Sequence, residues 1–82
     1  MTLPEITVAL AALAVSEGSI RTRMETLERT RCYADDSRFS PVVLKALIDM
    51  ADIQEWTLRE QLAIVNRART ELREQLEANH DT

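Results

Sequence analysis

The amino-acid sequence predicts an all-α protein, a long antiparallel helical hairpin that forms a single domain over residues 1–82. The chain holds one glycine and two prolines, whereas a β-protein of this length needs several turns built from glycine, asparagine or proline. Hydrophobic residues make up 45% of the chain and charged residues 29%, as in folded soluble proteins. Apolar residues also recur in alternating steps of three and four, a spacing typical of packed helices.

The first helix is predicted over about residues 3–34. Thr2 at the N-cap and Glu5 three residues later make a capping box. Its apolar ladder consists of Ile6, Leu10, Leu13, Ile20, Met24 and Leu27, and the same spacing falls on Glu17 and Arg31. Gly18 leaves an alternative, because glycine costs about 1 kcal/mol relative to alanine in a helix and the neighbouring serines can cap a new start. A break there would create a third, short helix; we expect one uninterrupted helix.

A turn is predicted over about residues 35–40, where Asp35, Asp36 and Ser37 favour turn formation. Ser40 as N-cap and Pro41 at the first helical position begin a second helix, over about residues 41–78, followed by a frayed tail at 79–82. Its ladder consists of Leu44, Ile48, Ala51, Leu58, Leu62, Val65, Leu72 and Leu76, with Glu55 and Arg69 on the same spacing.

The charges on these ladders favour an antiparallel homodimer. In each helix the ladder glutamate precedes the ladder arginine by 14 residues, so two copies of one helix laid antiparallel would bring each glutamate opposite an arginine. A short turn between the helices would align Arg31 with about Leu44. It would likewise align Glu17 with about Leu58, so the charges would not meet within one hairpin. The alternative is that these side chains lie at the edge of the seam and extend into water.

A second apolar stripe also indicates a partner. It contains Val43, Leu47, Met50, Ile53 and Ile64 in the second helix and Val8, Ala12 and Val15 in the first. A two-helix hairpin covers one stripe per helix, so we expect a dimer that forms a four-helix bundle. The residues predicted to form the dimer or partner interface are Ile6, Val8, Leu10, Leu13, Glu17, Arg31, Leu47, Met50, Ile53, Glu55, Trp56 and Arg69. Trp56 is a candidate interface anchor, with core packing as the alternative.

The residues that commonly carry chemistry are sparse. Cys32 and His80 are the only cysteine and histidine, so neither a disulfide within the chain nor a Cys- or His-rich zinc site is expected. Asp35 and Asp36 lack the spacing of a calcium loop. We therefore expect no catalytic residues, no metal and no cofactor, and a non-enzymatic protein. A chain this small without a disulfide or metal commonly needs a partner subunit for stability.

The apolar stretch from Ile6 to Val15 raises the question of a membrane or secretion. It is shorter than the roughly 20 residues that span a bilayer as a helix. Glu5 also stands where a secretion signal would carry a basic residue. The net charge is −4 with both signs interspersed. We expect a cytoplasmic protein without membrane contact.

The function expected from these features is a small helical module for protein–protein interaction that acts as a homodimer and binds another protein. Nine of the ten basic residues are arginine, a bias that fits a GC-rich bacterial or phage genome. A specific form is a bacteriophage or mobile-element inhibitor of a host protein. The alternative is a nucleic-acid-associated regulator whose phosphate contacts come from Arg21, Arg23, Arg29, Arg31 and Arg38. Nearby acidic residues can pair with these arginines, so nucleic acid is the less favoured partner.

Overall fold

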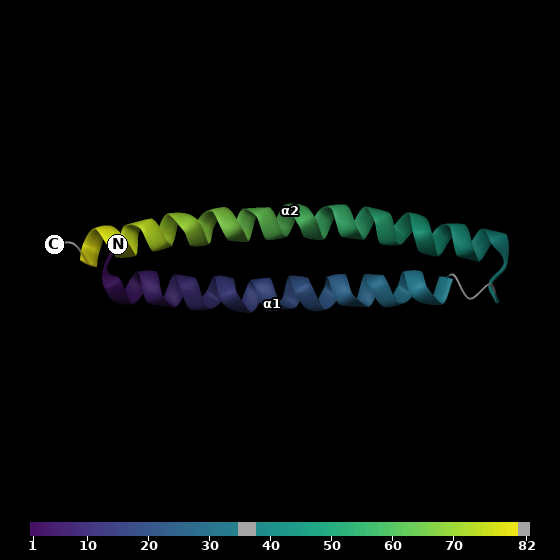
Figure 1. Ribbon diagram of the computed structural model, residues 1–82, viewed down its shortest axis with the longest axis horizontal. Helices are drawn as coiled ribbons and strands as arrows, with labels where there is room; N and C mark the ends of the chain where they lie inside the picture. The colour runs from purple at the N-terminus through teal and green to yellow at the C-terminus, as the bar shows by residue number, and fades with distance from the viewer. Residues whose placement is uncertain (35–37, 81–82) are drawn as a thin grey trace.

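The structure, a computed structural model, describes residues 1–34 and 38–80. In this part the chain forms two helices, α1 over Leu3–Ala34 and α2 over Pro41–His80. They lie side by side and antiparallel in a rod with extents of 63 × 15 × 14 Å (Figure 1). The prediction of an all-α hairpin is confirmed for these residues. The expected turn at Asp35, Asp36 and Ser37 and the last two tail residues lie outside the described part.

Side-chain caps set the beginning of both helices. Thr2 Oγ1 accepts a hydrogen bond from the Glu5 amide at 3.4 Å, and Ser40 Oγ accepts one from the Val43 amide at 3.4 Å. Each satisfies a backbone N–H that has no partner within the helix. α1 then continues through Gly18, whose carbonyl accepts a hydrogen bond from Thr22 Oγ1 at 3.0 Å. The uninterrupted first helix is therefore confirmed, and the alternative break at Gly18 is not seen.

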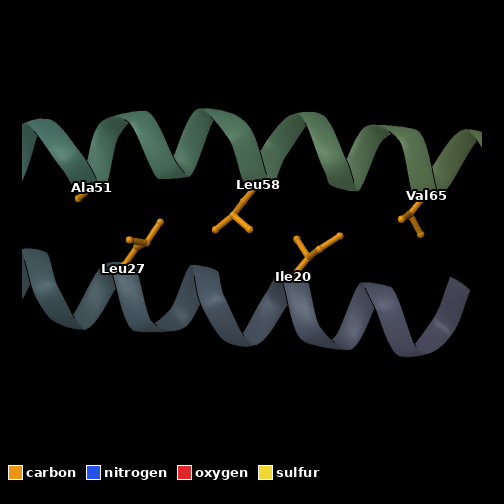
Figure 2. Close-up of a cluster of buried hydrophobic side chains, with 5 residues drawn as sticks. All are labelled: Ile20, Leu27, Ala51, Leu58 and Val65. Atoms are coloured by element: carbon orange, nitrogen blue, oxygen red, sulfur yellow. The ribbon is translucent and has the colours of Figure 1, made fainter.

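The core is a single row of apolar side chains between the helices. Ile20 and Leu27 of α1 alternate with Ala51, Leu58 and Val65 of α2, and Leu58 points between the two α1 side chains (Figure 2). Leu13, Met24 and Leu62 pack against this row, and Ile6 and Leu72 are buried as well. All of these side chains belong to the apolar ladders that the sequence shows.

The alignment of the two helices differs from the one that the sequence suggested. Arg31 lies beside Asp52 and Glu55 instead of Leu44, and Glu17 contacts Arg69 instead of Leu58. The shift is about three helical turns along α2. The expected alignment of Arg31 with Leu44 and of Glu17 with Leu58 was therefore wrong.

The shift leaves the first turns of α2 beyond the end of α1 (Figure 1). We call this segment, Pro41–Met50, the overhang. The observed alignment places oppositely charged ladder residues opposite each other while it keeps the apolar ladders in contact. A tight turn would have placed Arg31 and Glu17 against leucines, at the cost of a partly buried charge without a partner.

Candidate functional site

The first charged cluster joins the end of α1 to the middle of α2. Arg31 Nη2 donates to Asp52 Oδ1 and to Glu55 Oε2, both at 2.7 Å. Arg59 Nη2 donates to Glu55 Oε1 at 2.8 Å. The hydrogen bond from Arg31 is the main reason that the pKa of Glu55 lies below its ordinary value, and the positive charges of Arg31 and Arg59 act in the same direction.

The second charged cluster lies nearer the chain termini. Glu17 accepts hydrogen bonds from Arg21 Nε at 3.1 Å and Nη2 at 3.0 Å, and it also accepts one from Arg69 Nη1. Both ladder glutamates are thus bonded to ladder arginines of their own chain. The reasoning that reserved these four charges for a second copy was wrong, because it rested on the incorrect alignment. Their structural role is to fix how α1 and α2 align.

One flank of the hairpin carries these ion pairs, and we call it the charged face. It consists of the residues next to the ladders in α1 and α2: Arg21, Glu25, Glu28, Lys45, Asp49, Asp52, Arg59, Arg73 and Glu77. Lys45 Nζ donates to Asp49 Oδ2 at 2.8 Å, and this bond raises the pKa of Lys45. Such exposed pairs contribute little stability each, but together they make this flank strongly hydrated.

The opposite flank carries almost no charge, and we call it the charge-poor face. In α1 it consists of Ala9, Ala12, Ser16, Ser19, Arg23, Thr26 and Thr30. In α2 it consists of Val43, Leu47, Met50, Gln54, Thr57, Gln61, Ile64 and Ala68. Each set advances in steps of three and four, which keeps its members on one side of a helix. Arg23 is the single charged member.

A series of open grooves follows the charge-poor face along the rod and shows that both sets lie on the same flank. The groove nearest the overhang is lined by Thr30 of α1 and by Val43, Leu47 and Met50 of α2. The grooves that continue toward the termini are lined by uncharged polar side chains such as Gln54 and Gln61, by apolar side chains such as Ile64, and by Arg23. The face is therefore apolar at the overhang and a mixture of apolar and uncharged polar side chains along its middle.

Four of the five hydroxyl groups on this face donate hydrogen bonds within their own helix. Ser16, Thr26, Thr30 and Thr57 each donate to the backbone carbonyl four residues earlier, at 3.0–3.2 Å. Their hydroxyls therefore lose little when another surface covers them, because no unsatisfied donor is left behind. The charge-poor face can be buried at lower cost than the charged face.

The residues predicted to form an interface fall in three places. Those on the seam are Ile6, Leu10, Leu13, Glu17, Arg31, Glu55 and Arg69. Leu47 and Met50 lie on the charge-poor face, Ile53 lies at the edge of that face, and Val8 and Trp56 lie on the outer sides of the helices. Trp56 is 68% exposed and does not pack in the core between α1 and α2. The sequence reasoning did not assign Gln54 or Gln61 to a surface and considered Arg23 only as a phosphate contact. The spacing of these residues in steps of three and four was a usable signal.

Two of the five arginines considered for nucleic-acid binding are paired with carboxylates of the same chain. Arg21 is bonded to Glu17, and Arg31 is bonded to two carboxylates. Phosphate groups would have to compete with these pairs.

Among the described residues there is no group of three or more His, Cys, Asp or Glu side chains that could hold a metal ion.

α1 is apolar enough to raise the question of a membrane again. By length and composition alone, Leu3–Tyr33 could cross a bilayer: its most apolar 18-residue window has a hydropathy of 1.4, and 11% of that window is buried in the hairpin. Core helices of soluble proteins and signal sequences meet the same criterion. The apolar surface of α1 is thus larger than α2 covers.

Comparison with known proteins adds no relative. No protein-family model matches the sequence, and no curated protein or solved structure shows detectable similarity to it.

Proposed function

We propose that this protein acts through protein–protein contacts and catalyses no reaction. In this proposal two copies form a four-helix bundle in the cytoplasm, and the dimer binds a further protein. The specific form that we favour is an inhibitor of a host protein encoded by a bacteriophage or mobile element, because the chain is small and nearly all its basic residues are arginine.

The exposed area of the hairpin is the observation that carries this proposal. The chain exposes 6372 Å², whereas a compact monomer of 9.3 kDa exposes about 5,000 Å². The excess is larger than the roughly 800 Å² that each partner buries in an interface of standard size. A single hairpin is therefore under-packed by about one protein interface.

The character of the exposed surface supports the same proposal. Among the described residues, large hydrophobic side chains that are exposed outnumber those that are buried. Val42, Met50, Ile64 and Val15 are all more than half exposed. Apolar surface on this scale in a soluble protein usually marks a contact with another molecule.

Trp56 is the residue that we assign to the further protein. It stands on the outer side of α2 and is 68% exposed. Tryptophan is enriched among residues that dominate binding energy. Trp56 lies away from the charge-poor face, so a partner bound there leaves that face open to a second copy.

The proposal is tested by affinity purification of the tagged protein from its native host, followed by mass spectrometry, for the unmodified chain and for Trp56→Ala. We expect one protein to be recovered in stoichiometric amount, and its recovery to fall at least about tenfold with Trp56→Ala. Ala63→Ser, an exposed substitution on the same helix, serves as the matched control. Equal recovery with all three chains would contradict the assignment of Trp56.

The nucleic-acid alternative has a separate test. If the arginines of α1 bound phosphate, DNA or RNA would bind at low salt and the affinity would fall steeply as salt is added. The ion pairs of Arg21 and Arg31 argue against it. We expect no binding at low salt; strong, salt-sensitive binding would favour the alternative.

A further inference from the structure

We propose that the charge-poor face is the surface on which the second copy binds, with the overhangs of both copies at the same end of the bundle. Each overhang then packs against the overhang of the other copy. This inference rests on the proposed homodimer, for which it names the surface and the orientation.

The distribution of charge selects the face. In a symmetric dimer a surface meets a copy of itself, so a face rich in charge would bring like charges together. The charge-poor face avoids this, because Arg23 is its only charge and four of its five hydroxyls are bonded within the helices. The charged face would instead have to give up the hydration of ion pairs such as Lys45–Asp49 and Arg21–Glu17.

The overhang selects the orientation. It carries Val43, Leu47 and Met50 toward the charge-poor face, but α1 ends before it and covers it only at its edge. With both overhangs at one end, apolar side chains of one copy meet those of the other. In the opposite orientation the overhang would lie against the terminal end of the other copy, and the two apolar overhangs would not meet.

Arg23 supports the same orientation. It lines two neighbouring grooves together with Gln61, so it lies near the middle of the face. If the two copies ran in opposite directions, the Arg23 side chains of both copies would meet there and repel each other. With the overhangs together, α1 of one copy faces α2 of the other at the same level, and each Arg23 can donate a hydrogen bond to Gln61 of the second copy.

Disulfide cross-linking tests this arrangement. Leu47→Cys is made in a chain whose exposed native cysteine is removed by Cys32→Ser, and Met50→Cys is a second variant at the same end. Mild oxidation should give a covalent dimer with both, because each engineered cysteine lies close to its own copy. Ala63→Cys, on the outer side of α2 away from the charge-poor face, is the matched control and should stay monomeric on a non-reducing gel. Helical circular dichroism of each variant establishes that it is folded.

The outcomes separate this inference from the proposed function. Sedimentation equilibrium of the unmodified chain reports the homodimer by itself. A dimer whose Leu47→Cys and Met50→Cys variants do not cross-link would overturn the face or the orientation, and leave the homodimer standing. A monomer in buffer would overturn both, and a monomer that also binds phosphatidylcholine vesicles would assign the apolar surface to a membrane instead.

Discussion

Gly18 has the lowest intrinsic helix propensity of the residues in the interior of α1. It lies in the interior of α1, and a Cβ added there would meet no atom within 4 Å. Gly18→Ala should therefore raise the free energy of unfolding by about 0.5–1 kcal/mol, because alanine loses less backbone entropy than glycine. Thermal denaturation checks this as a rise of a few degrees in Tm. Ala63→Gly, at an exposed helical site, should lower Tm by a similar amount. A loss of stability in Gly18→Ala would contradict a continuous α1.

Glu55 makes stability depend on pH. Its pKa in the folded protein is lowered from the ordinary 4.5, chiefly by the hydrogen bond from Arg31, so the unfolded chain binds the proton more readily. The stabilisation is present above the unfolded pKa and disappears as the pH falls through the lowered, folded value. We expect urea denaturation to show a steeper loss of stability below about pH 5 for the unmodified protein than for Glu55→Gln. A constant difference between the two proteins at every pH would contradict this role.

At the scale of the helices, the alignment of α1 and α2 is the main structural result. Glu17 and Arg69 stand opposite each other across the seam. Glu17→Arg should destabilise the hairpin by bringing two arginines together, and the double variant Glu17→Arg with Arg69→Glu should recover part of the loss. A double-mutant cycle in urea should give a coupling energy of about 1 kcal/mol. No coupling between the two positions would mean that the helices align differently.

Much of each helix could be predicted from the sequence, but the way the two helices meet could not. The caps at Thr2 and Ser40 and the apolar ladders are local patterns, so they are visible in the chain itself. A repeating ladder is compatible with several alignments, and the assumption of a short turn selected the wrong one. The pairing of Arg31 with Glu55 depends on residues 24 apart, and only the folded hairpin shows that they meet.

The candidate surface was likewise predictable only in part. Leu47 and Met50 stood out as apolar residues away from the ladder. The neutral side chains that continue their stripe, such as Gln54 and Gln61, belong to the same face because of how α1 lies beside α2. Which flank of one helix adjoins which flank of the other follows from the alignment, and therefore from the structure.

At the scale of the whole molecule, the hairpin resembles half of a four-helix bundle, with one hydrated flank and one neutral, grooved flank. If folding and association are coupled, the dimer is stabilised by mass action. Tm should therefore rise with protein concentration over a hundredfold range, as measured by circular dichroism. A Tm that is independent of concentration would show that the hairpin folds without a second copy.

The proposed homodimer on the charge-poor face is tested most directly by sedimentation equilibrium, because the method reports mass independently of the 63 Å length of the rod. The unmodified chain should have twice the monomer mass of 9.3 kDa. Met50→Glu, which places a carboxylate on the charge-poor face, should shift it to the monomer, whereas Ala63→Glu on the outer side of α2 should remain a dimer. A mass of 9.3 kDa for the unmodified chain, or a Met50→Glu variant that stays dimeric, would contradict the proposed assembly.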